Sequence, residues 1–181
     1  MPRTRTGSMA KSDSFFVRSQ VTATSGAFTE TEIDLGAFVD VQDKTILRVH
    51  NIAVQYTDST GIIVDITAST ATNAAVRWQL NTQSQTALVT ADDRSVVSTG
   101  SFVLYNNNSA TQNGANAINE TLDMSPQDWT GGYLIAVESL FLGGERDANF
   151  ASGDVDVTIV MECSTETMGV NQAMALAMSQ Q

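Results

Sequence analysis

Apolar and polar side chains alternate with a period of two along most of this chain. In residues 155–163, Val155, Val157 and Ile159 alternate with polar neighbours, which places the apolar groups on one face of a β-strand. Similar alternation, or a compact apolar run, recurs in seven further segments separated by connectors rich in Gly, Asn and Asp. These segments are residues 15–24, 33–35, 45–57, 62–68, 76–81, 102–105 and 133–142, with an additional candidate at residues 87–90. The pattern therefore predicts about eight strands.

The segment 45–57 changes phase along its length. Leu47 and Val49 occupy odd positions, whereas Ile52 and the apolar residues after it occupy even ones. One extra residue near His50 would return all of them to a single buried face, so we predict a β-bulge there.

The segment 133–142 is apolar almost without a break, which is typical of a central strand buried on both faces. Two connectors, residues 106–119 and 143–153, are long and polar. Long connectors without secondary structure in a compact domain are usually functional surfaces or assembly contacts. We therefore expect such a role for these two loops.

Only residues 170–181 show a helical pattern. Val170, Met174 and Met178 fall at i, i+4 and i+8, and the alanines between them favour a helix. A helix of about twelve residues is not stable alone, so it must dock on the β-strands of its own chain or on a neighbouring subunit. The period leaves both choices open. If the helix docks on a neighbour, Val170, Met174 and Met178 would form an assembly contact, because flexible Met side chains adapt to a partner.

These elements predict an all-β fold. Eight strands over 181 residues, with several long connectors, favour an eight-stranded antiparallel β-sandwich of jelly-roll type with a short C-terminal helix. An immunoglobulin-like sandwich is the main alternative, but such domains are shorter and carry two cysteines. We expect three parts: a basic N-terminal arm at residues 1–13, the sandwich at residues 14–165 and a helical tail at residues 166–181.

The composition of the chain limits which metal sites and cross-links it can form. The chain has 22 Thr, one His and one Cys. β-branched Thr fits a pleated sheet, while a single His and a single Cys exclude a Cys/His zinc site, a cupin-type metal centre and a disulfide framework. No apolar stretch approaches the roughly 20 residues that a membrane-spanning helix needs. The N-terminus lacks the apolar core of a secretory signal.

Charge is unevenly distributed along the chain. The net charge is −11, but residues 1–20 hold Arg3, Arg5, Lys11 and Arg18 against a single acid. The remaining residues hold five basic and 19 acidic side chains, so a basic arm of about +3 precedes an acidic body of about −14. An acidic body repels phosphates. The arm, in contrast, is suited to face a polyanion. A frayed, soluble terminus is the alternative that the charge count leaves open.

Catalytic candidates are few. A Ser-His-Asp or Cys-His arrangement would have to use His50, with Cys163 or a serine as the nucleophile. Both residues lie within predicted strands, and the chain contains no G-x-S-x-G elbow, so we expect structural roles and no enzyme activity. Pro126 predicts a fixed turn after it, with Trp129 buried as a structural side chain.

An acidic loop is the best candidate for a metal site. Asp147, Asn149, Asp154 and Asp156 lie close together in the sequence, next to Glu145. Carboxylates and an amide carbonyl are ligand types that Ca²⁺ uses, although the spacing matches no EF-hand. Acidic loop residues on an acidic protein are usually only solvated. Calcium is therefore a hypothesis, and we expect no other cofactor.

The strand pattern over residues 14–165, preceded by the basic arm from Arg3 to Arg18, resembles the single jelly-roll capsid proteins of icosahedral viruses. The resemblance is architectural, since that family has no sequence signature to match. It implies a structural, self-assembling subunit of the virion shell, whose partners are copies of itself, with or without a sister capsid protein. It also implies an arm that faces the genome or an internal membrane, and no small-molecule substrate.

Two other functions stay open at this point. An extracellular β-sandwich binding module or adhesin would explain the polar loops, but the sequence predicts no aromatic platform and shows no export signal, which a trimmed precursor would hide. A small hydrolase would need a catalytic set, and none is recognisable. Assembly into a shell accounts for the arm, the acidic body, the loops and the tail together, so we expect the virion as the location.

Overall fold

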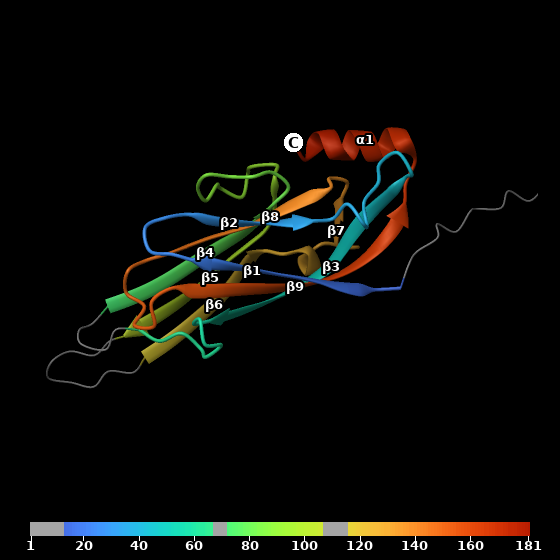
Figure 1. Ribbon diagram of the computed structural model, residues 1–181. Coiled ribbons are helices and arrows are strands. Elements are labelled where there is room, and N and C mark those ends of the chain that lie inside the picture. Colours follow the sequence, from blue (N-terminus) through green and yellow to red (C-terminus); the bar gives the residue numbers. More distant parts are fainter. Residues whose placement is uncertain (1–12, 67–71, 107–115) are drawn as a thin grey trace, which may run out of the picture.

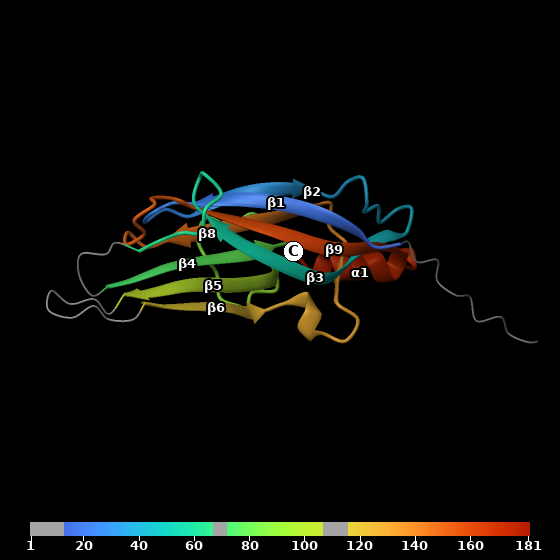
Figure 2. The ribbon, with the colours of Figure 1, turned by 90° about the horizontal axis from the view of Figure 1, so that it is seen from below.

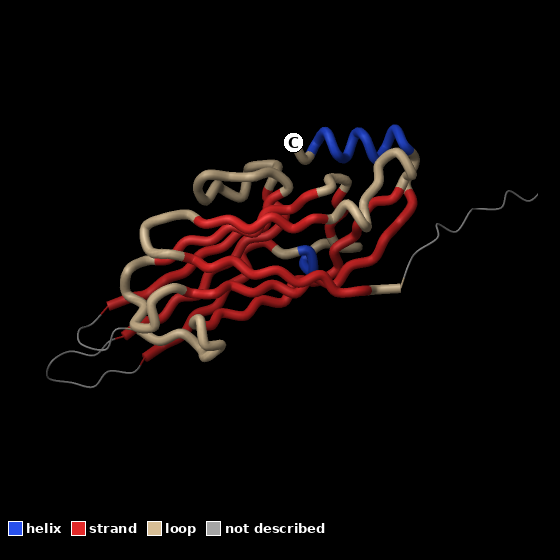
Figure 3. The backbone as a smooth tube through the Cα atoms, viewed as in Figure 1, coloured by secondary structure: helices blue, strands red, loops and turns tan. Residues whose placement is uncertain are grey.

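A computed structural model describes residues 13–66, 72–106 and 116–181 (Figure 1). Its strands form two antiparallel sheets and are joined by turns, loops and a short 3₁₀ helix η1 (Pro126–Asp128) (Figure 3). A C-terminal helix α1 (Val170–Ser179) follows the last strand. The first sheet has the order β1-β9-β3-β7 and the second the order β2-β8-β4-β5-β6. The strands are β1 (Phe15–Ala23), β2 (Thr29–Asp34), β3 (Thr45–Thr57), β4 (Thr72–Asn81), β5 (Val96–Asn106), β6 (Asn116–Met124), β7 (Tyr133–Ile135), β8 (Ser139–Arg146) and β9 (Val155–Thr167).

The order of the strands is that of a jelly roll. The consecutive strands β4, β5 and β6 stay in the second sheet. At every other connection the chain passes from one sheet to the other. Strands that are distant in the sequence therefore pair, as β1 does with β9, and the two sheets enclose one core. This is the jelly-roll architecture, and it confirms the predicted fold class. The extra strand β6 lies at the edge of the second sheet, beyond β5 (Figure 2).

The core lies between the sheets and contains the inward-facing side chains of both. Trp78 is fully buried there, and its Nε1 donates a 2.8 Å hydrogen bond to the hydroxyl of Tyr56. The Tyr56 ring stacks on Phe102 at a centroid distance of 4.8 Å. Gly100 lies opposite Trp78 in β5, and a Cβ there would be 2.9 Å from the indole nitrogen. The glycine therefore makes room for the large indole ring.

Two local predictions are confirmed. The register of β3 against β9 shifts between Val49 and Asn51, which is the bulge expected near His50. The C-terminal helix begins at Val170, where the period predicts it.

Residues 62–68 and 87–90 do not form the predicted strands. Ile63 and Ile66 make only isolated bridges, and the last two residues of the first segment lie outside the described part. Residues 87–90 belong to the long connection between β4 and β5. Apolar alternation does not make a strand where no neighbouring strand is placed to pair with it.

The apolar run at residues 133–142 is two strands rather than one central strand. β7 pairs with β3 in the first sheet, whereas β8 pairs with β2 and β4 in the second. Ile135 and Leu140 are both fully buried on either side of the crossing, so the apolar pattern continues while the chain changes sheet. β8 also runs to Arg146, so the loop expected from residue 143 begins later.

The strand β6 is missed by the sequence pattern. It lies partly in the connector expected at residues 106–119, and its side chains from Ile118 to Asp123 are exposed. An edge strand without a buried face has no hydrophobic period to reveal it. The domain boundaries stay a prediction; β9 ends at Thr167, slightly beyond the expected end of the sandwich.

Candidate assembly surfaces

Helix α1 packs on its own sandwich through small residues. Ala173 is fully buried in a second apolar cluster with Ile46 and Ala136. Leu176 and Ala177, three and four positions further on, pack against the same cluster. Of the two docking modes left open by the sequence, this structure has the helix on its own body.

Gln180 fixes the end of this helix to the strand region around β7. Its side-chain carbonyl accepts a hydrogen bond from the backbone N–H of Ala136 (3.1 Å), and its amide donates to the carbonyl of Leu134 (2.6 Å). The hydroxyl of Thr82 donates to the backbone carbonyl of Gln180. Because Gln180 is buried, water competes little for these bonds. The helix is therefore held by packing in its middle and by hydrogen bonds at its end.

The predicted assembly residues lie largely on the remaining face of α1. Met174 and Met178 are 52% and 71% exposed, and Val170 is partly buried. Figure 1 shows the helix, in red, at one end of the sandwich. A pair of exposed methionines on a docked helix suits contact with a neighbour. The contact itself stays a prediction.

Of the predicted arm residues, only Arg18 lies in the described part; Arg3, Arg5 and Lys11 lie outside it. Arg18 is exposed on β1, and its guanidinium carbon lies 5.7 Å from the centroid of the Phe16 ring, a cation–π distance. The outer face of β1 thus carries an exposed pair of an aromatic and a cation next to the arm.

The carboxylates among the predicted calcium ligands already have protein partners. These pairs are Asp147 with the backbone amides of Ala75 (2.7 Å) and Asn149 (2.9 Å), Asp154 with the guanidinium of Arg146 (2.8 Å), and Asp156 with the hydroxyl of Thr22 (2.7 Å). Within the described residues, no group of three or more His, Cys, Asp and Glu side chains could hold a metal ion. Calcium binding stays a prediction, without a preformed site in this part of the chain.

His50 and Cys163 lie on neighbouring strands of the first sheet. His50 Nε2 is 2.8 Å from Ser164 Oγ, but Ser164 is 1% exposed, so a substrate could not reach this oxygen. Cys163 is fully buried, and burial raises the pKa of its thiol to about 12. It is therefore protonated at neutral pH and a poor nucleophile.

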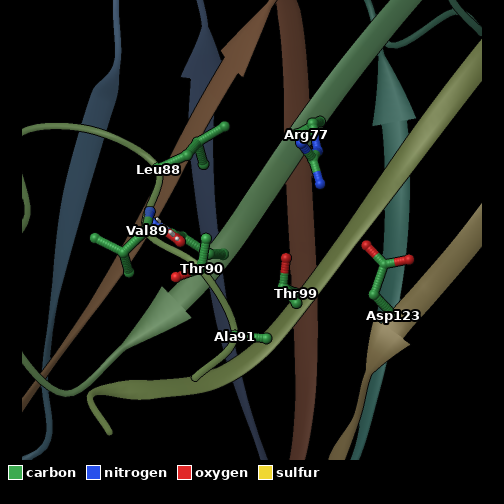
Figure 4. A pocket seen from close by; sticks show the side chains of 8 residues that line it. Arg77, Leu88, Val89, Thr90, Ala91, Thr99 and Asp123 are labelled. Carbon is green, nitrogen blue, oxygen red and sulfur yellow. Dashed lines mark hydrogen bonds between the residues drawn. The ribbon is translucent and has the colours of Figure 1, made fainter. Parts of the chain in front are cut away.

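The outer face of the second sheet carries a hollow of about 410 Å³. Figure 4 shows Arg77, Thr99 and Asp123 on one side of it and the loop residues 88–91 on the other. The Thr99 hydroxyl donates to a backbone carbonyl of β4, and the Gln79 side-chain carbonyl accepts from the loop backbone. Arg77 and Asp123 present opposite charges, but the lining residues include no paired nucleophile and base.

The turn after β6 places Trp129 at the surface. Trp129 is 51% exposed whereas Pro126 is buried, so the prediction of a buried Trp129 is wrong. The proline, not the indole, anchors the turn. Trp129 lies beside a hollow of about 650 Å³ between the turn, α1 and the β4–β5 connection, called here the Trp129 hollow. It is lined by Arg48, Arg94, Trp129, Thr130, Gly132, Tyr133, Leu134, Leu176, Ser179 and Gln180.

No family model matches this chain, and no curated protein matches it. Across residues 13–66, 72–106 and 116–181, no helix has the length and apolar character needed to cross a membrane.

Several solved structures resemble the fold over nearly the whole chain. VP1 of Trichodysplasia spinulosa-associated polyomavirus, in complex with sialylated glycooligomers, is 8% identical with a TM-score of 0.42, and the match covers 86% of this chain and 95% of VP1. VP1 of Merkel cell polyomavirus, as an unassembled pentamer, is 6% identical with a TM-score of 0.42, covering 86% and 96%. A chain of Desmodium yellow mottle tymovirus is 8% identical with a TM-score of 0.36, covering 92% and 93%. These neighbours are viral capsid jelly-roll proteins. Each likeness is distant, so the strand order itself defines the fold.

Proposed function

We propose that this chain is the self-assembling subunit of a viral shell, a capsid protein. The observation that carries the proposal is a jelly-roll body that leaves large apolar side chains exposed at separate places on its surface. Phe16, Trp129 and Met178 are 56%, 51% and 71% exposed. Exposed apolar side chains at several separate positions on a subunit favour contacts with more than one neighbouring subunit.

The distribution of charge supports the same function. The basic arm with Arg3, Arg5 and Lys11 precedes a body of about −14. Such an arm can bind a genome or an anionic membrane, while the acidic body is repelled by both. The arm would therefore face the interior of the virion, and the body would build the shell.

Size-exclusion chromatography and negative-stain imaging of the purified chain, at low and at high salt, test the proposal. Capsomers or closed shells are expected. They should form more readily at high salt, because screening weakens the repulsion between acidic bodies. A monodisperse monomer at high concentration in both salts would contradict the proposal, and glycan binding by that monomer would favour an adhesin.

The methionine face of α1 gives a sharper version of this test. Met174→Gln with Met178→Gln removes exposed apolar surface but leaves the docking residues of the helix in place. We expect weaker assembly of a folded body. Ala175→Gln is the matched control, because Ala175 is an exposed position on the same helix. Equal weakening by both variants would contradict a specific role for the methionines.

A further inference from the structure

The turn that carries Trp129 is held to β3 at three points. At the first, the Gln127 side chain makes two 3.2 Å hydrogen bonds with Ile52, accepting from its N–H and donating to its carbonyl. At the second, Gly132 has a φ of 74°, and a Cβ there would collide with the carbonyl oxygen of Val49. The backbone of the turn therefore lies directly on the strand.

The third point is Arg48. Its guanidinium donates to the Glu166 carboxylate through Nε (2.6 Å) and Nη2 (2.7 Å), and to the backbone carbonyl of Gly131 through Nη1. Glu166 is 7% exposed, so this bidentate pair is shielded and fixed in orientation. All three points of attachment belong to neighbours of Trp129. The indole is thus presented on a turn that is already ordered, which lowers the entropy cost of binding a partner.

The Trp129 hollow contains the residue types that dominate protein–protein contacts. Tyr133 and Arg94 line it together with Trp129, and Trp, Tyr and Arg are enriched among the residues that carry most binding energy. Arg94 is exposed and forms no ion pair within 4 Å with any residue of the described ranges, and its charge acts only at longer range on the neighbouring Asp93. An exposed guanidinium beside apolar surface favours a partner that carries a carboxylate.

We propose that the Trp129 hollow is an interface that receives strand β6 of a second copy of this chain. β6 has the complementary chemistry, since Ile118, Glu120 and Leu122 alternate on one side of the strand, Ile118 and Leu122 are 60% and 36% exposed, and Glu120 between them is also exposed. Within the described residues β6 is also the edge of its sheet, and an exposed edge is open to a neighbouring chain. This contact rests on the proposed self-assembly and specifies one of its interfaces.

The contact joins two different patches, so it runs head to tail. Helix η1 directly follows β6 and leads into the turn of Trp129, which places the two patches on neighbouring parts of the surface (Figure 2). A head-to-tail contact generates a ring when the rotation closes. A ring of subunits is the form expected of a capsomer.

Sedimentation velocity of the full chain, in the salt at which the wild type associates, measures the contact. Trp129→Ala and Arg94→Glu should each weaken association about tenfold or more, while Trp129→Phe retains most of it. Lys44→Glu is the matched control, because it makes the same charge change at an exposed residue that does not line the hollow. It should leave association within about twofold, and circular dichroism checks that every variant is folded.

An exchange of charges tests the partner segment. Glu120→Arg should weaken association, and adding Arg94→Glu to that variant should restore it, because opposite charges face one another again. Weakening without restoration would overturn the assignment to β6. If Trp129→Ala associates as tightly as the wild type, the interface is overturned while self-assembly stands. A wild type that stays monomeric overturns both.

Discussion

The two tryptophans show that a side chain can be exposed although the backbone that carries it is firmly held. Trp78 is fully buried between the sheets and donates a hydrogen bond to Tyr56. Trp129 is half exposed, although the turn around it is held to β3 by Gln127 and Arg48. The Trp78 indole stabilises the fold because folding removes its apolar surface from water. The other sits on a turn that is anchored to β3 and leaves about half of its surface exposed, at 51%, for a partner.

The largest effect is expected at Trp78. Trp78→Ala would leave a large cavity next to Tyr56 and remove that hydroxyl's donor, so we expect a loss of about 3–5 kcal/mol in the free energy of unfolding. Urea denaturation followed by circular dichroism measures it. If the loss were no larger than that of Trp129→Ala, the two indoles would not differ in the way that their burial implies.

A smaller loss is expected when the Trp129 turn is forced off the strand. Gly132→Ala adds a Cβ against the Val49 carbonyl at a positive φ, and should cost about 1–3 kcal/mol. Gly61→Ala is the matched control, since Gly61 has a φ of 84° and a Cβ added there would meet no atom within 4 Å. The control isolates the cost of the positive φ. Equal losses would mean that the turn is not pressed onto β3.

The Tyr56 hydroxyl adds a pH dependence to the buried region. Burial raises the pKa of Tyr56 above its ordinary value of 10.0, and the hydrogen bond from Trp78 only partly opposes this. The folded state therefore keeps a proton that the unfolded state loses. The contribution of Tyr56 to stability is fully present below pH 10 and is lost as the pH rises through the folded pKa, at up to about 1.4 kcal/mol per pH unit.

Denaturation curves between pH 8 and about pH 12 of the wild type and Tyr56→Phe test this. We expect a shallower alkaline loss in the variant. Some loss should remain, because burial also raises the pKa of Cys163 to about 12. Parallel curves for the two proteins would mean that Tyr56 does not titrate differently on unfolding.

The regular part of the fold follows from local pattern. Alternation predicts most strands of the jelly roll, and the phase change in residues 45–57 predicts the bulge after Val49. These features depend on which face of a strand is buried, and side-chain period carries that information. The edge strand β6 escapes because its described side chains face solvent on both sides.

The candidate surfaces depend on contacts between distant segments, which no local pattern contains. Pro126 predicts a turn. Hydrogen bonds with Arg48 and Ile52, about 80 residues earlier in the chain, hold this turn against β3 and leave the Trp129 side chain exposed. In the tail, the apolar stripe places Met174 either against the chain's own body or against a neighbouring subunit. The helix docks through Ala173, whose small side chain lets the backbones approach closely.

The smallest effect on stability is expected from Trp129→Ala. Because the attachments of the turn belong to its neighbours, removing the half-exposed indole should change the free energy of unfolding by no more than about 0.5 kcal/mol. A loss of several kcal/mol would show that the indole is part of the fold. Acrylamide quenching of tryptophan fluorescence gives an independent measurement, since the monomer should contain one quenchable and one protected indole. If a second copy covers the Trp129 hollow, the quenchable fraction must fall as the wild type associates, while Arg94→Glu, at the same protein concentration, keeps it.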